Sequence, residues 1–134
     1  MFAGSLVALI TPFRNGSVDE KGFVQLSGED ASAVGFLAQG GDGCISVTAN
    51  VAPRLCADMH DAWRARELDK VFEIQDRLMP MHKAMFCETS PGPVKFGAEL
   101  IGQASAEMRL PMVPIAESSK KAVREAMVHA GLLN

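Results

Sequence analysis

The sequence predicts an α/β fold in which three parallel strands precede a helical carboxyl-terminal region. A continuous apolar run at residues 6–10 is typical of a strand buried on both faces. A strand, loop, helix and strand then follow one another within residues 23–47, which is the pattern of a parallel βαβ unit. Apolar residues recur at helical spacing beyond that unit. We therefore expect strands within residues 1–50 and helices continuous with them over residues 51–134.

Composition excludes several classes of function. The 134 residues are 48% hydrophobic and 22% charged, with a formal net charge of -3, so the surface should attract neither nucleic acid nor an anionic membrane. No apolar run approaches the roughly 20 residues of a membrane span, and the first residues lack the charged start of a signal peptide. The three cysteines, Cys44, Cys56 and Cys87, have no CxxC spacing, which disfavours a zinc site or a disulfide framework. We expect a cytoplasmic protein without metal or cofactor.

The strands can be placed from their boundaries. Thr11 and Pro12 end the first apolar run, and residues 14–22, which include Asn15-Gly16, are expected to form a turn and connection. A second strand is expected at residues 23–26. Asp30 is a candidate N-cap for a helix to about Gln39, closed by Gly40-Gly41, and a third strand follows at residues 44–47.

The helices are predicted from apolar stripes. Residues Leu55, Met59 and Trp63 mark one helix, and Val71, Ile74, Leu78, Met81 and Met85 mark a second, in which Pro80 should cause a kink or a break. A third helix is expected to start near Val94, after a segment rich in proline. An extended connection at residues 110–114 leads to a last helix, which opens at Ser118 and turns Val123, Met127 and Ala130 inward.

Most candidate chemical groups have a simpler structural explanation. The glycine-rich residues 40–43 close a helix and enter a strand, the reverse of a phosphate-binding loop, so they are interpreted as a helix cap. Asp58 and Asp61 are expected on a solvated face, and Cys44 as an inert strand residue. The histidines have no metal-binding spacing and are taken as surface or hydrogen-bonded residues: His60, His82 and His129.

Position alone singles out the ends of the strands. In parallel α/β proteins the ligand site lies where the strands end. Small and polar residues gather at all three ends, in Thr11-Pro12, residues 27–30 and residues 46–50. Ordinary turn chemistry explains the same residues, so this alternative stays open.

These segments carry a resemblance to a known family. Residues 4–13 resemble the first strand of the dihydrodipicolinate synthase (4-hydroxy-tetrahydrodipicolinate synthase) family, and residues 26–31 and 43–52 resemble its seventh and eighth strands. The resemblance continues through residues 77–83, 93–95, 109–114 and 130–133. It implies an internally truncated member: a partial (β/α)8 TIM barrel over residues 1–50, with a carboxyl-terminal helical subdomain.

The resemblance also implies a chemistry. Members are class I aldolase-like lyases of lysine and diaminopimelate biosynthesis, which hold pyruvate as a Schiff base on a lysine and condense it with aspartate semialdehyde. The segment with that lysine, the catalytic tyrosines and the Gly-Thr-Thr-Gly-Glu loop has no counterpart here, and the sequence contains no tyrosine. We therefore assign no catalytic residue. Two substrate-binding positions carry over: Ile45, whose main-chain carbonyl would face pyruvate, and Gly28, which would line the substrate side.

We expect little or no activity from the chain alone. An ordinary lysine, with a pKa of about 10.4, is protonated at neutral pH, and all six lysines are expected in the connection or on outer helices. These are Lys21, Lys70, Lys83, Lys95, Lys120 and Lys121. The alternatives are a non-catalytic interaction fragment, as a homo-oligomer or on a full-length subunit, and a deletion product.

The order of the three expected strands is unusual. If they keep the family's order, in which the seventh, eighth and first strands are neighbours, the connection from the first strand to the seventh is a left-handed crossover, which is found in only about 2% of cases. We therefore expect that the order rearranges or that the sheet is poorly formed.

Overall fold

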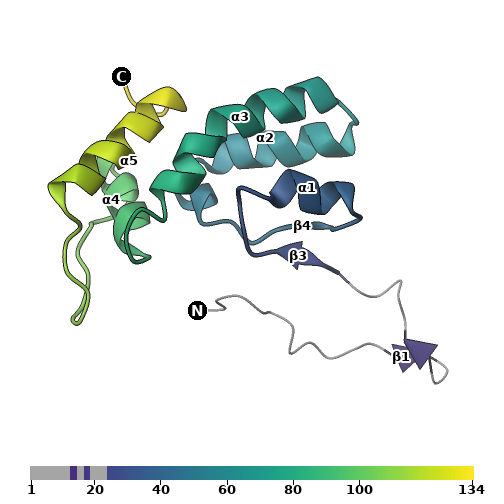
Figure 1. Ribbon diagram of the computed structural model, residues 1–134, viewed down its shortest axis with the longest axis horizontal. Coiled ribbons are helices and arrows are strands. Elements are labelled where there is room, and N and C mark those ends of the chain that lie inside the picture. The colour runs from purple at the N-terminus through teal and green to yellow at the C-terminus, as the bar shows by residue number, and fades with distance from the viewer. Residues whose placement is uncertain (1–12, 15–16, 19–23) are drawn as a thin grey trace. The chain divides into compact units, whose positions relative to one another are not determined.

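The computed structural model describes residues 13–14, 17–18 and 24–134, and it divides the chain into two compact units, Met1–Ile45 and Ser46–Asn134 (Figure 1). The strand expected at residues 6–10 lies outside the described residues. In the first unit, β1 (Phe13–Arg14) pairs antiparallel with β2 (Ser17–Val18). The sequence predicted only a turn and a connection there. Strands of two residues are too short to show an alternating pattern in the sequence, which explains the difference.

The parallel pair of the predicted βαβ unit is present. Strand β3 (Leu26–Ser27) pairs in parallel with β4 (Gly43–Cys44), with α1 (Ala33–Ala38) between them in sequence. Both strands are shorter than predicted. Val47, expected in the second of them, has helical dihedral angles and precedes the 3-10 helix η2 (Thr48–Asn50). Within the described residues this sheet has two strands, and the third strand of the expected sheet, residues 6–10, stays a prediction.

Helix α1 differs from its prediction at one end and agrees at the other. Asp30 is not its N-cap. Ser32 occupies that position, while the Asp30 carbonyl accepts the Ala33 N–H in a preceding turn at 3.2 Å. At the other end Gly40 has φ +97°, and its N–H donates to the Leu37 carbonyl while that of Gly41 donates to Phe36. This is the Schellman arrangement of a helix end, which confirms the glycine-rich residues as a cap.

The second unit is a helical assembly. It contains α2 (Pro53–Arg64), α3 (Leu68–Ala84), α4 (Gly92–Leu100) and α5 (Glu117–His129), and α2 lies beside α3 (Figure 1). The predicted stripe of α3 is confirmed, since all five of its members are buried. The three residues expected inward on α5 are also buried. The central cluster is formed by residues of α3, α4 and α5 and the residues that cap them, together with Val51: Val51, Met81, Ala84, Met85, Val94, Ala98, Val123, Ala126, Met127 and Ala130.

Two details of the helices differ from the sequence prediction, and the start of α4 agrees with it. Pro80 does not break α3, because Leu78 and Met81 are fully buried on either side and their packing offsets the lost hydrogen bond. In α2 the buried side is formed by Cys56, Met59 and Ala62, and Trp63 is only half-buried. Helix α4 begins two residues before Val94, with a proline in its first turn, where a missing N–H costs nothing.

Both ends of α5 are held by side chains from elsewhere in this unit. At its start, Glu88 Oε1 accepts the Ala116 N–H at 2.9 Å. At its end, Arg77 of α3 donates from Nε to the Ala130 carbonyl at 2.8 Å, a favourable site for a cation. Gly131, with φ +73°, then ends the helix. The Arg77 bond ties the end of α5 to α3, and the Glu88 bond ties its start to the segment that follows α3.

Candidate functional site

The two residues assigned to substrate binding lie opposite each other. The register of β3 and β4 pairs Leu26 with Gly43 and Ser27 with Cys44, so Gly28 and Ile45 are the residues that directly follow the last pair on each strand. The Ile45 N–H donates to the Ser27 carbonyl at 2.8 Å, which holds Ile45 beside the end of β3. Gly28 and Ile45 are therefore neighbours at the carboxyl ends of two parallel strands, where ligands bind in α/β folds. Their role toward a substrate stays a prediction.

One face of this small sheet is exposed and apolar. Because successive side chains of a strand alternate between faces, Val24, Leu26 and Ile45 share one face with the Gly28 position. Their exposed fractions are 62%, 42% and 49%. We call these three side chains the bare face. On the other face Ser27 is buried and Cys44 half-buried, and α1 packs against β4 (Figure 1).

The polar residues after β3 mainly build a turn. Ser27 Oγ accepts the Glu29 N–H at 3.1 Å and donates to the Glu29 carbonyl at 3.0 Å. Glu29 Oε1 in turn accepts the Ala31 N–H at 2.9 Å. Gly28 is different, since a Cβ added there would meet no atom within 4 Å. The described chain thus leaves open space at Gly28, whereas its polar neighbours serve the backbone.

The polar residues after β4 also have structural roles. Ser46 Oγ accepts the Ala49 N–H at 2.8 Å, and Asn50 Nδ2 donates to the Val47 carbonyl at 3.0 Å. Thr48 Oγ1 lies 2.8 Å from His82 Nδ1, and both side chains are buried. His82 is therefore a hydrogen-bonded core histidine, one of the two alternatives that the sequence left for it. The sequence offered no sign of its partner, 34 residues away.

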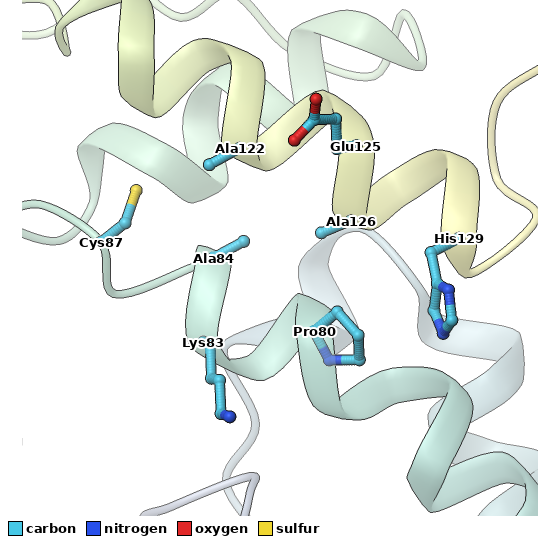
Figure 2. Close-up of a pocket in the computed structure, with 8 residues that line it drawn as sticks. All are labelled: Pro80, Lys83, Ala84, Cys87, Ala122, Glu125, Ala126 and His129. Carbon is cyan, nitrogen blue, oxygen red and sulfur yellow. The ribbon is translucent and has the colours of Figure 1, made fainter.

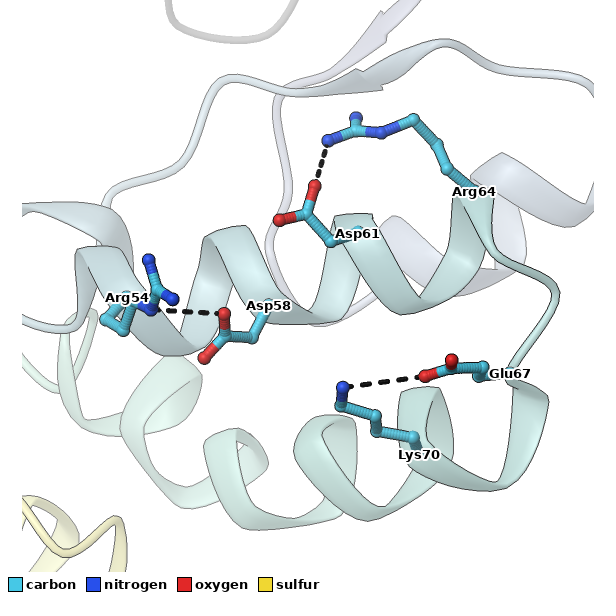
Figure 3. A network of polar contacts seen from close by, with 6 residues as sticks. All are labelled: Arg54, Asp58, Asp61, Arg64, Glu67 and Lys70. Carbon is cyan, nitrogen blue, oxygen red and sulfur yellow. Dashed lines mark hydrogen bonds and ion pairs between the residues drawn. The ribbon is translucent and has the colours of Figure 1, made fainter.

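The aspartates of α2 belong to a surface charge cluster (Figure 3). Asp58 pairs with Arg54 at 3.2 Å, and Asp61 pairs with Arg64. No group of three or more histidine, cysteine or acidic side chains is placed to hold a metal ion within the described ranges. In the same ranges, no helix is both long enough and apolar enough to cross a membrane.

The described lysines all lie on the surface. Lys70 and Lys121 approach the carboxylates of Glu67 and Glu125, at 3.5 and 3.8 Å, and Lys120 pairs with Glu117. Lys95 Nζ donates to the Glu107 carbonyl, and Lys83 is exposed. Lys21 lies outside the described residues. A lysine that forms a Schiff base needs burial or a cationic neighbour to lose its proton. None of these five is buried, and the charged neighbours of Lys70, Lys120 and Lys121 named here are carboxylates.

A pocket of about 440 Å³ lies between the end of α3 and α5 (Figure 2). Alanines and Pro80 form much of its lining, and Lys83, Glu125 and His129 stand around it. Figure 2 shows Lys83 and Glu125 directed away from each other. The charged groups therefore do not converge on one point, as a catalytic or ligand-binding set would.

The solved structures that share this fold are TIM-barrel enzymes. The chain superposes on dihydrodipicolinate synthase of Thermotoga maritima with a TM-score of 0.81 and 38% identity, over 85% of this chain and 39% of that one. A model of the dihydrodipicolinate synthetase family matches residues 17–130, and the chain belongs to this family. The family resemblance inferred from the sequence is thereby confirmed.

The curated relatives are longer than this chain. The 4-hydroxy-tetrahydrodipicolinate synthase of Gluconacetobacter diazotrophicus is 55% identical over 118 residues, which cover 88% of this chain and 40% of that protein. The enzyme of the same name from Rhodospirillum centenum is 55% identical over 125 residues, covering 93% and 43%. The chain thus spans about two-fifths of the length of these relatives, and it is a fragment of the full-length family fold.

Proposed function

We propose that this chain carries the last two barrel strands and the carboxyl-terminal helices of a 4-hydroxy-tetrahydrodipicolinate synthase, and that it is inactive alone. The observation that supports this most directly is the parallel pairing of Ser27 with Cys44, which places the following residues, Gly28 and Ile45, side by side at the ends of β3 and β4. Both are positions that line the pyruvate site in the family. Residues 6–10 would add a third parallel strand, giving a partial barrel over residues 1–50 and helices over residues 51–134. A cytoplasmic location is part of the same proposal.

The proposed roles follow from the chemistry of the reaction. In the family, a lysine amine attacks the carbonyl of pyruvate and water leaves, which gives a protonated imine. Loss of a methyl proton then forms the enamine that attacks the aldehyde of aspartate semialdehyde. In this chain the Ile45 carbonyl would face bound pyruvate, and the open space at Gly28 would admit it. Neither residue supplies the amine or moves a proton.

Trapping with borohydride tests this proposal. Pyruvate and borohydride are added to the purified chain, and each lysine is examined by mass spectrometry for a reduced adduct. We expect no adduct and no condensation with aspartate semialdehyde, because the lysine, tyrosines and carboxylate-binding loop act as a unit. The Rhodospirillum centenum enzyme, treated in parallel, is the positive control. A stoichiometric adduct on one lysine of this chain, most informatively Lys21, would restore catalysis to it.

A second candidate function is a non-catalytic interaction fragment. The exposure of the bare face favours it, since apolar side chains gathered on one side of a sheet are typical of a contact surface. The partner would be a full-length subunit or another copy of the chain. A deletion product without a selected role is the remaining alternative. It is tested by the genomic sequence at residues 21–23, where the resemblance passes from the first strand of the family to the seventh. An intact coding segment for the intervening strands immediately beside this point would support it.

A further inference from the structure

We infer that the bare face and the outer edge of β3 bind a separate polypeptide that supplies the barrel strands this chain does not have. The inference rests on the proposed function and extends it by naming the partner. The chain would then be one part of a two-chain barrel. Three observations carry the argument: the chemistry of the bare face, the direction of the backbone groups of β3, and the share of the family fold that the chain covers.

The bare face exposes apolar side chains to solvent. Parallel sheets are almost always covered on both faces, because side chains on either side of their strands are apolar. Here Ser27 and Cys44 are covered, whereas Val24, Leu26 and Ile45 are between 42% and 62% exposed. In a TIM barrel the helices lie outside and the opposite side of each strand faces the barrel interior. The bare face, opposite the side packed on α1, is thus the side that the other strands would enclose.

No strand among the described residues pairs with the outer edge of β3. The Gln25 carbonyl accepts the Asp42 N–H at 2.8 Å, and the Ser27 carbonyl accepts that of Ile45 at the same distance. Both Gln25 and Ser27 therefore turn toward β4. Because alternate residues direct their N–H and C=O groups to opposite edges, those of Leu26 point away from β4. An edge of this kind is a template for another strand.

The occupant is identified from the part of the family fold that this chain does not match. The relatives from Gluconacetobacter and Rhodospirillum are matched over 40% and 43% of their lengths, so the remaining part of either is long enough to supply the other strands and the Schiff-base lysine. A second copy fits less well. A two-fold axis through paired β3 edges would make the strands antiparallel, whereas the barrel continues with parallel strands.

The test joins this chain to a complement. The complement is the part of the Rhodospirillum centenum synthase outside its matched 125 residues, with an affinity tag, and the two chains are expressed together. We expect a one-to-one complex by light scattering, and slower amide exchange at residues 24–45 than in the chain alone. Pyruvate and borohydride should then label a lysine of the complement only.

A matched pair of variants tests the surface itself. Val24→Asp places a charge on the bare face, and Val113→Asp places the same charge on a connection, at a valine that is 66% exposed against 62% for Val24. Burying an unpaired carboxylate is unfavourable, so Val24→Asp should weaken the complex by at least about tenfold and Val113→Asp should not. Leu26→Lys, with Leu110→Lys as its control, repeats the comparison. Circular dichroism should show wild-type helix content in all four.

Each contrary result has its own meaning. Absence of a complex, a complex equally tight with Val24→Asp, or unchanged exchange at residues 24–45 would overturn the inference. Self-association of the chain that excludes the complement, and that Val24→Asp abolishes, would overturn it in favour of a second copy. A pyruvate adduct on this chain alone would overturn the proposed function, whether or not the complex forms.

Discussion

The Thr48 hydroxyl lies 2.8 Å from Nδ1 of His82, and both residues are buried, with exposed fractions of 0% and 3%. The carbonyl of Thr48 also accepts the N–H groups of Val51 and Ala52, at 3.0 and 2.9 Å. Side chain and main chain together fix the first turn of the second unit, η2, against α3.

Thr48→Val should destabilise the protein by about 1–3 kcal/mol, because it removes one partner of a buried hydrogen bond and keeps the shape of the side chain. Chemical denaturation followed by circular dichroism measures the change in the free energy of unfolding. Thr89→Val is the matched control: Thr89 is exposed, and a change within about 0.5 kcal/mol is expected there. Equal effects of the two substitutions would mean that the Thr48–His82 bond contributes nothing.

The helical core was predictable because its signal is local. The stripe from Val71 to Met85 repeats at the helical period within a single element, and every member is buried. Of the two alternatives at Pro80, a kink or a break, the break was wrong. Whether a proline interrupts a helix depends on packing from other helices, which spacing along one helix does not record. The α2 stripe failed at Trp63 for a related reason, since the buried side is chosen by the contact with α3.

The candidate site was predictable only through the family. Gly28 and Ile45 lie 17 residues apart, and their adjacency depends on the register of β3 against β4, which the apolar pattern does not specify for such short strands. Asp30 was wrongly predicted as the N-cap because aspartate is a common residue at that position. The turn formed by Ser27 and Glu29 instead moves the start of the helix further along the chain. The bare face had no sequence signal, since an apolar strand residue is ordinarily a covered one.

Leu78→Ala should lower the free energy of unfolding by about 2–5 kcal/mol, since it removes a fully buried side chain and leaves a cavity at the centre of α3. Phe72→Ala on the same helix is the control, because Phe72 is 52% exposed. Removal of the larger phenyl group of Phe72 should lower the free energy of unfolding less than removal of the smaller isobutyl group of Leu78. The reverse order in a urea titration would show that α3 packs by a different side.

Glu88 should make stability depend on pH. The hydrogen bond from the Ser119 side chain, and then that from the Ala116 N–H, lower the pKa of Glu88 from its ordinary value of 4.5. A carboxyl whose pKa is lowered in the folded state stabilises it above the unfolded pKa, and this contribution is lost as the pH falls through the folded value. Glu88→Gln should therefore be less stable than wild type at pH 7, with the difference vanishing in acid.

Thermal melts from pH 7 down to about pH 3 measure this difference, and that range spans the ordinary pKa of a glutamate. Glu73→Gln serves as the control, because Glu73 is an exposed residue of α3 with neither of these hydrogen bonds. A gap between wild type and Glu88→Gln that stays constant with pH would contradict the role of the Glu88 charge at the start of α5.

Amide exchange should be slowest between residues 51 and 86. Helix α3 packs against both α2 and α5, so its amides exchange only when the central cluster opens. Strands β3 and β4 are two residues long, and the side chains of the bare face beside them are already exposed to solvent. Local opening of these strands therefore exposes little additional apolar surface. Hydrogen exchange followed by mass spectrometry on the isolated chain, with peptides that separate residues 24–45 from residues 68–84, makes the comparison. Slower exchange in the strands than in α3 would mean that the bare face is already covered in solution. That result would count against a vacant docking surface on this chain.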